Sequence, residues 1–237
     1  MKKIFLGLIL VAFTLQAEEI YATFNVQAEK NAKLAFSSSG IIGEVLVDVT
    51  SEVKKDEVLA KLQNDDLKAQ LNITQTALKY AKYDYDRQLK VQSIIDKAKF
   101  DQFAFKYENA KAQLIFQQAM LDKTSLKAPF DGIIYEKAIE VGDVVSGQMI
   151  TTVFKIQSKH NRKLILEFDQ KYHQSIKIGD TFKYKVDGDT NKYEGKISKI
   201  YPYANTKTRK IKAEVIAKDF VVGLFGDGYI TTQKQEF

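Results

Sequence analysis

Two segments of the chain, residues 40–62 and 132–156, resemble each other, and a stretch of a different character separates them. Both open on a Gly-Ile-Ile triplet and continue into runs of β-branched residues broken by turn residues. An interrupted repeat of this kind predicts two half-motifs that pack on each other while the intervening chain leaves and returns. This constraint excludes folds in which each half-motif is complete without the other.

The register of the repeat is imperfect. Aligning Val53 with Val144 places Val58-Leu59 on Met149-Ile150 and leaves the opening glycines one loop residue out of step. The sequence alone therefore predicts a small difference between the first loops of the two half-motifs.

The separating stretch, residues 64–124, contains no Gly and no Pro, and apolar residues recur along it every seven positions. Such seams predict helices packed as a coiled coil. Fifteen residues separate Tyr85 from Phe100, so the two seams do not share one frame. The first seam is Leu67, Leu71, Leu78, Ala81 and Tyr85, and the second is Phe100, Phe103, Tyr107, Ala110, Leu114 and Leu121.

The change of frame at residues 93–97 predicts a reversal of the chain and therefore a helical hairpin. Each arm of about 28 residues would be roughly 40 Å long. Asn64 is expected to cap the first helix, and Leu78 and Leu114 are expected to be buried against the opposite arm. The alternative, one long helix with a stutter, would hold the half-motifs far apart and leave both without a partner.

The N-terminus has the layout of a secretory signal. Lys2 and Lys3 precede an apolar run that ends before Ala17, and this run is shorter than the roughly 20 residues that span a bilayer. We therefore expect residues 1–17 to direct export, with an uncleaved anchor as the alternative. No cysteine follows the run, so a lipoprotein anchor is not expected.

Composition excludes several chemistries. The chain has no Cys, no Trp and only two His, so thiolate sites and disulfides are absent and histidine metal sites have few ligands. The net charge of +6 falls to +4 without Lys2 and Lys3, and lysines alternate with acidic residues. The one basic cluster, residues 207–212, is interpreted as a solvated strand end, so no nucleic-acid partner is expected.

The remaining segments have a β character. Residues 18–33 predict an N-terminal strand that joins a barrel or a membrane-proximal region, and residues 158–237 predict a small antiparallel β-barrel from alternating runs separated by turns, with a helical turn near residues 170–176. The predicted fold is mainly β, with two half-motifs at residues 34–63 and 125–157 that pack on each other and a long coiled-coil hairpin at residues 64–124.

This order of parts resembles the periplasmic adaptor proteins, or membrane fusion proteins, of tripartite efflux systems (HlyD-like, RND-type). The run Leu126-Lys127-Ala128-Pro129-Phe130-Asp131-Gly132-Ile133-Ile134 and residues 141–148 carry the closest likeness. The resemblance implies a lipoyl-like sandwich split by the hairpin, then a barrel. It also implies a non-catalytic protein without cofactors that links an inner-membrane transporter, with the RND type favoured over an ATP-driven one, to a TolC-type outer channel and assembles as a ring.

The hairpin tip departs from the family pattern. Where members that dock TolC-type channels often carry Arg, Leu and Ser, this chain has Tyr85, Leu89 and Asp96. Because nothing is expected to pack over the tip, exposed side chains are expected at Leu89, Ser93, Ile94, Ile95 and Asp96. Exposed apolar residues in a group predict a partner surface. The predicted partner-binding residues are Leu89, Ser93, Ile94 and Asp96. The alternative is that Ile94 and Ile95 only close the end of the hairpin.

Three motifs with possible chemistry are weak. A carrier lysine would lie between the half-motifs, where this chain has its helices. Residues 187–198 begin like a calcium loop but have Lys192 and Ser198 where Gly and Glu belong. His173 and Asp169 lack a third metal ligand. The sequence therefore predicts no catalytic, cofactor-binding or metal-binding residues.

A second function is compatible with the export signal and the helices: an exported coiled-coil binding or adhesion protein without a transport role. It gives no reason for the split half-motifs. A neighbouring transporter gene would favour the adaptor, and an isolated gene would favour the adhesion protein.

Overall fold

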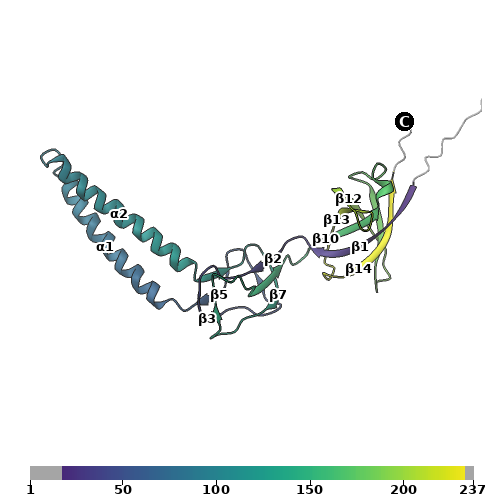
Figure 1. The fold of residues 1–237 in the computed structure, drawn as a ribbon, viewed down its shortest axis with the longest axis horizontal. Helices are drawn as coiled ribbons and strands as arrows, with labels where there is room; N and C mark the ends of the chain where they lie inside the picture. The colour runs from purple at the N-terminus through teal and green to yellow at the C-terminus, as the bar shows by residue number, and fades with distance from the viewer. Residues whose placement is uncertain (1–17, 233–237) are drawn as a thin grey trace, which may run out of the picture. The chain divides into compact units, whose positions relative to one another are not determined.

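The computed structural model describes residues 18–232, so the predicted export signal lies outside the described residues. Two compact units divide the chain, residues 31–159 and residues 18–30 with 160–232, and each is described by itself. The first unit holds the sandwich and the hairpin, and the second holds the barrel (Figure 1). The predicted fold class, mainly β with a helical hairpin, a split sandwich and a small barrel, is confirmed.

The sandwich has two four-stranded sheets, and each sheet draws strands from both half-motifs. Strand β4 of the first half pairs with β7 of the second, and β8 of the second half pairs with β3 of the first. The sheets are ordered β2-β9-β7-β4 and β6-β5-β3-β8. Neither half is therefore a complete sheet alone. Their strands are β2 (Asn31–Leu34), β3 (Gly40–Val45), β4 (Glu52–Val53), β5 (Val58–Leu62), β6 (Ser125–Lys127), β7 (Gly132–Lys137), β8 (Val144–Val145) and β9 (Phe154–Gln157).

The pairing corrects the register of the repeat. Gly40 pairs with Val145, and Gly132 pairs with Val53. Each glycine thus lies thirteen residues before the corresponding valine (53 − 40 and 145 − 132), so Val53 corresponds to Val145. The alignment of Val53 with Val144 is wrong, and the one-residue offset of the glycines disappears.

The difference between the halves lies later, in the loop before the last strand. Leu62 and Ile156 correspond, because each pairs with the isoleucine of its own Gly-Ile-Ile triplet. The second half is therefore two residues longer after its valine (156 − 145 against 62 − 53). Leu59 then corresponds to Val153, and both are buried. The alignment of residues 58–59 with 149–150 is wrong, because residues 149–150 belong to the longer, exposed loop.

The helical hairpin consists of α1 (Asp65–Leu89) and α2 (Lys97–Asp122), which lie side by side (Figure 1). Both arms are shorter than the 28 residues expected, because residues 90–96 form a non-helical turn. The seam residues Leu78 and Leu114 are half-buried rather than fully buried, since a two-helix hairpin covers each seam from one side only. The fully buried positions in the arms are the polar residues Thr74 and Gln117.

Asn64 stands at the N-cap position of α1, but its side chain does not cap the helix. Its Nδ2 donates to the hydroxyl of Thr124 over 2.9 Å, and both residues are buried. The Thr124 hydroxyl in turn donates to the carbonyl of Leu121 over 2.7 Å. The predicted position of the cap is confirmed, but the capping hydrogen bond is absent, and the side chain instead joins the two ends of the hairpin where they enter the sandwich.

The second unit is a closed antiparallel barrel of six strands in the order β1-β10-β13-β12-β11-β14. Alternate residues of β1 point into its core, as the period of a strand requires. Near residues 170–176, where the sequence predicts a helical turn, the structure has one 3-10 turn, Gln170–Tyr172. The strands are β1 (Glu18–Ala28), β10 (Asn161–Asp169), β11 (Thr181–Val186), β12 (Tyr193–Asn205), β13 (Lys210–Lys218) and β14 (Phe225–Thr232).

Neither helix of residues 18–232 combines the length and the apolar character that a membrane crossing requires.

Candidate functional site

The turn between the two arms is built from backbone hydrogen bonds between residues three apart in the sequence. The amide of Val91 donates to the carbonyl of Gln88, and the amide of Ile94 donates to the carbonyl of Val91, each over 3.1 Å. These tight turns end α1 and reverse the chain. Asp96 then begins α2, because its carboxylate accepts a hydrogen bond from the amide of Lys99 over 3.1 Å.

This turn presents apolar side chains to solvent. Ile94 is 84% exposed and Leu89 is 45% exposed. Ser93 is exposed as well, whereas Ile95 is half-buried, in contrast to the expectation that it is exposed. Val91, at 39% exposure, is a tip residue that the sequence pattern did not single out. Its position directly after the last turn of α1, outside the seam, was the available signal.

The four predicted site residues thus divide by role. Leu89, Ser93 and Ile94 have exposed side chains at one end of the hairpin. Asp96 is exposed too, but its Oδ1 already serves the N-terminus of α2. A carboxylate at this position also interacts favourably with the helix dipole. Asp96 therefore caps α2, and a contact with a partner would be a second role for this residue.

Aromatic contacts hold the arms together immediately below the turn. The ring of Tyr85 stacks on Tyr107 at a centroid distance of 5.2 Å and lies 5.7 Å from the ring of Phe100. Lys82 pairs with Asp86 over 2.7 Å, and this hydrogen bond raises the pKa of the Lys82 ammonium. The two aromatic contacts join α1 to α2, whereas the ion pair lies within α1.

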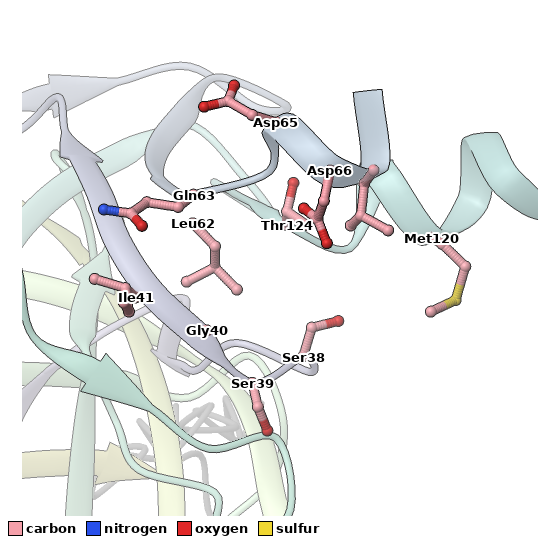
Figure 2. A pocket seen from close by; sticks show the side chains of 11 residues that line it. Ser38, Ser39, Gly40, Ile41, Leu62, Gln63, Asp65, Asp66, Met120 and Thr124 are labelled. Atoms are coloured by element: carbon pink, nitrogen blue, oxygen red, sulfur yellow. The ribbon is translucent and has the colours of Figure 1, made fainter. Parts of the chain in front are cut away.

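A second feature lies at the other end of the hairpin, where it joins the sandwich. A cavity of about 680 Å³ opens there between β3, the start of α1 and the end of α2. Figure 2 shows the Met120 side chain on one side of it and Ile41 and Leu62 on the other. Ser38, Ser39, Asp65 and Asp66 are among the polar residues that line it. The cavity therefore has both apolar and polar lining residues, which come from the sandwich and from both arms of the hairpin.

The segment that begins like a calcium loop has a structural role. The carboxylate of Asp189 accepts from the Tyr193 hydroxyl over 2.6 Å and from the amide of Asn191 over 2.9 Å, which closes the turn between β11 and β12. The hydrogen bond from Tyr193 lowers the pKa of this carboxyl group. Within residues 18–232, no group of three or more His, Cys, Asp or Glu side chains could hold a metal ion.

Comparison with known sequences identifies the sandwich and hairpin. A family model of the CzcB-like barrel-sandwich hybrid domain matches residues 30–157. The chain is 25% identical over 204 residues to the cobalt-zinc-cadmium resistance protein CzcB of Cupriavidus metallidurans, a match that covers 79% of this chain and 39% of CzcB. It is also 25% identical over 194 residues to an uncharacterized protein of Haemophilus influenzae, covering 80% of this chain and 50% of that protein. The chain spans half or less of the length of these relatives.

Solved structures share the fold at low sequence identity. A MacA–MexA chimera that contains the Pseudomonas aeruginosa MexA α-hairpin domain has a TM-score of 0.83 at 19% identity, covering 91% of this chain and 82% of the chimera. The membrane fusion protein Spr0693 from Streptococcus pneumoniae R6 has a TM-score of 0.72 at 17% identity, covering 91% and 100%. Because the domain model spans more than half of the chain, the chain belongs to the family of CzcB-like membrane fusion proteins, the periplasmic adaptors.

Proposed function

We propose that the chain is the non-catalytic adaptor subunit of a tripartite efflux pump. In this proposal it joins an inner-membrane transporter, of the RND type, to a TolC-type outer-membrane channel. It is exported by residues 1–17, is not a lipoprotein, and works in the periplasm as a ring of several copies. Family membership and the shared fold support the adaptor role.

The observation that carries the proposal is the exposed apolar tip of the hairpin. A helix of 25 residues is about 38 Å long at 1.5 Å per residue. The arms thus present Leu89 and Ile94 far from the sandwich, at the point where the chain reverses. An adaptor needs this separation, because it must contact an inner-membrane transporter and an outer-membrane channel at the same time. A binding protein without a transport role has no need for a sandwich in which each sheet contains strands from both half-motifs.

We propose that Leu89 and Ile94 insert between helix ends of the outer channel, and that Ser93 and Asp96 add polar contacts. An apolar side chain that is exposed in the free protein gains free energy when a partner removes it from water. Exposed apolar residues that gather at one end of an element are typical of a partner surface. The half-buried Ile95 contributes to closing the turn instead.

Single charged substitutions at the tip test this proposal. Ile94→Asp or Leu89→Asp should make cells as susceptible to the pump's substrates as cells that lack the gene. The free energy of unfolding should change by less than about 0.5 kcal/mol, because these residues lie on the surface. The matched control is Ile115→Asp. It replaces an isoleucine that is 64% exposed and lies in the half of α2 that is farther from the tip. Unchanged efflux in both tip variants would falsify the proposed docking.

The susceptibility assay should include both metals and drugs. The name of one relative links it to cobalt, zinc and cadmium resistance, and we propose divalent metal cations as the first substrates to test. An adaptor need not hold the transported compound, so the described residues need not contain a metal site. Cells without the gene should become sensitive to at least one compound on this panel. A panel-wide absence of any change, in cells that depend on the pump's transporter, would contradict the adaptor role.

A further inference from the structure

Strand pairing brings several segments of the second unit together at one end of the barrel. β10 ends at Asp169, which pairs with Lys210 at the start of β13, and Lys210 pairs with Asn205 at the end of β12. Because β1 runs antiparallel to β10, with Thr23 opposite Glu167, the first residues of β1 lie at the same end. We call this end the N-terminal rim, and it consists of residues 18–19, 169–180 and 201–210.

The predicted export signal joins the barrel at the N-terminal rim. Glu18 is the first residue of β1, and residues 1–17 directly precede it. β1 runs from this rim to the opposite end of the barrel, where Ala28 pairs with Arg162 (Figure 1). A signal segment meets the membrane during export, so this rim is the part of the barrel next to that segment.

A basic hairpin forms one side of the rim. The Oδ1 of Asn205 accepts a hydrogen bond from the amide of Lys207 over 2.9 Å, which helps to build the turn between β12 and β13. Lys207 and Arg209 are exposed, and within residues 18–232 neither takes part in an ion pair. The carbonyl of Arg209 accepts from the amide of Gln170 over 3.0 Å, so the 3-10 turn with the exposed Lys171 is held against this hairpin.

An irregularity in β12 lies beside this hairpin. Ile200 pairs with Ala213 and Ala204 pairs with Ile211, so four steps along β12 match two along β13 (204 − 200 against 213 − 211). Bulges are frequent at the rims of barrels, where they re-aim a side chain. Tyr203 lies in this bulge and is 57% exposed.

Neighbouring contacts hold the aromatic side chains of the bulge. The hydroxyl of Tyr201 donates to the carboxylate of Glu214 over 2.8 Å, and the rings of Tyr201 and Tyr203 meet edge to face at a centroid distance of 6.1 Å. Ile178, in the loop between β10 and β11, is 67% exposed at the same rim. The rim therefore presents an aromatic and an aliphatic side chain to solvent together with basic residues.

Basic and aromatic residues of the rim line one cavity of about 740 Å³. Lys171, His173, Tyr203 and Arg209 are among its lining residues. The one carboxylate among the described lining residues belongs to Asp169, and its Oδ1 already accepts a hydrogen bond from the amide of Lys171 over 2.9 Å. Two cationic side chains against one carboxylate favour an anionic ligand over a cation.

The other acidic residues of the rim do not line this cavity. Glu18 and Glu19 are exposed on β1, and the carboxylate of Asp180 accepts from the amide of Lys177 over 2.7 Å. Glu18 attracts the ammonium of Lys171. Arg209 is therefore the cation of the cavity that is most available to an anion from outside.

A basic site flanked by exposed tyrosine and aliphatic side chains is suited to the surface of an anionic bilayer. Tyrosine is enriched at the level of the lipid headgroups, Lys and Arg near the surface are attracted to anionic lipids, and a guanidinium binds phosphate through two parallel hydrogen bonds.

We infer that the N-terminal rim rests on the outer leaflet of the inner membrane. In this arrangement Arg209 and Lys171 bind the phosphate of an anionic phospholipid, and Tyr203 and Ile178 enter the headgroup layer. The inference rests on the proposed export of the chain. It adds a lipid contact that does not depend on docking to a transporter or a channel.

A single tryptophan tests which end of the barrel meets the bilayer, because the chain has none of its own. In the full chain, Tyr203→Trp should give a blue-shifted emission with vesicles of phosphatidylcholine and phosphatidylglycerol, and brominated lipids should quench it. The matched control is Phe225→Trp, which replaces an aromatic residue that is 63% exposed and pairs with Asn25 near the opposite end. Residues 1–17 are the same in both variants, so the difference between the two reporters measures the contact of the barrel.

Charge variants of the Tyr203→Trp protein test the phosphate contact. Each basic residue near an anionic surface contributes about fivefold to binding. Lys171→Gln combined with Arg209→Gln should therefore raise the half-saturating lipid concentration about 25-fold, and each single variant should raise it about fivefold. Lys192→Gln combined with Lys218→Gln removes the same charge from exposed positions at the opposite end and should change it less than about twofold.

Each remaining outcome would contradict the inference. Equal shifts from the reporters at positions 203 and 225 would show that the rim makes no specific contact. An equal response to vesicles of phosphatidylcholine alone would exclude binding through an anionic headgroup. A shift at position 203 with inorganic phosphate in the absence of vesicles would indicate a site for a soluble anion. No response to any vesicle, while the tip variants still lose efflux, would refute the lipid contact and leave the proposed adaptor function intact.

Discussion

The two halves of the sandwich share a core and differ at the surface. Ile42 and Ile134 are both completely buried, and each is followed by a β-bulge at the same place in its strand. The loop after β4 is short and charged, and the amide of Lys54 donates to the Glu57 carboxylate over 2.8 Å. The corresponding loop after β8 is two residues longer and exposes Met149 and Ile150.

This comparison separates two kinds of constraint. Several positions that fill the shared interior hold an aliphatic residue in both halves, such as Leu59 and Val153 or Leu62 and Ile156, whereas buried Ala60 corresponds to buried Phe154. Positions outside the shared interior differ between the halves. The first half has a charged turn closed by its own hydrogen bond, and the second has an apolar loop. The differences between the halves therefore mark surfaces whose sequence the fold does not determine.

The largest expected effect comes from the equivalent core isoleucines. Ile42→Ala and Ile134→Ala should each lower the free energy of unfolding of residues 31–159 by about 2–5 kcal/mol, because each removes buried methyl groups and leaves a cavity. The two losses should agree within about 1 kcal/mol. Urea unfolding of the full chain followed by circular dichroism measures them. A much smaller loss in one half would show that the halves do not share the core equally.

The opening glycines should differ in cost. A Cβ at position 132 would lie 2.5 Å from the backbone carbonyl oxygen of Gln157, whereas a Cβ at position 40 would meet the Leu62 side chain at 3.1 Å. Backbone cannot move away as a side chain can, so Gly132→Ala should cost about 1–3 kcal/mol and Gly40→Ala less than about 1 kcal/mol. The same unfolding experiment compares them. Equal costs would mean that the second half relaxes as easily as the first.

An exchange of edge-strand residues should have a small effect. Glu52 and Val144 occupy equivalent positions, and Glu52 pairs with Lys159 over 2.6 Å with both side chains largely in solvent. Glu52→Val should therefore change the free energy of unfolding by less than about 1 kcal/mol. Val144→Glu is the reciprocal control. A larger loss from Glu52→Val alone would show that this ion pair contributes to the sandwich itself.

The smallest effect is expected in the longer loop. Met149→Ser combined with Ile150→Ser should leave the free energy of unfolding within about 0.5 kcal/mol of the original value, because both side chains are exposed and no core position changes. Thermal unfolding provides the check. A clear destabilisation would place these residues among the core contacts and remove the distinction between the halves.

Features with a strong local or periodic signal were predictable from the sequence. The seam residues Leu71, Leu78 and Tyr85 indicated the hairpin, because an apolar period of seven residues is typical of helices packed side by side. The turn residues and alternating runs indicated the sandwich and the barrel. The exposed position of Leu89 and Ile94 followed from the break in the seam.

Features that depend on distant residues were not predictable. The side chain of Asn64 resembles a helix cap because the capping signal is local, and nothing local indicates Thr124 sixty residues later. The predicted register of the repeat is wrong because Met149-Ile150 is an apolar pair like Val58-Leu59. Only the pairing of the strands shows that Leu59 corresponds to the buried Val153 and that Met149 and Ile150 are exposed. At the tip, the sequence did not show that Asp96 also serves as the N-cap of α2.

The hydrogen bond between Asn64 and Thr124 also bears on how the chain folds. Strands β5 and β6 pair directly, although the whole hairpin lies between them in sequence. Closing so long a loop from a disordered chain costs conformational entropy and slows folding. The hydrogen bonds within each helix are local, and only the turn at residues 90–96 separates the adjacent ends of the arms, so we expect the hairpin to form from the turn outward and bring its own two ends together. The chain then joins β5 to β6 as if they were sequence neighbours, and the long insertion imposes little delay on assembly of the sandwich.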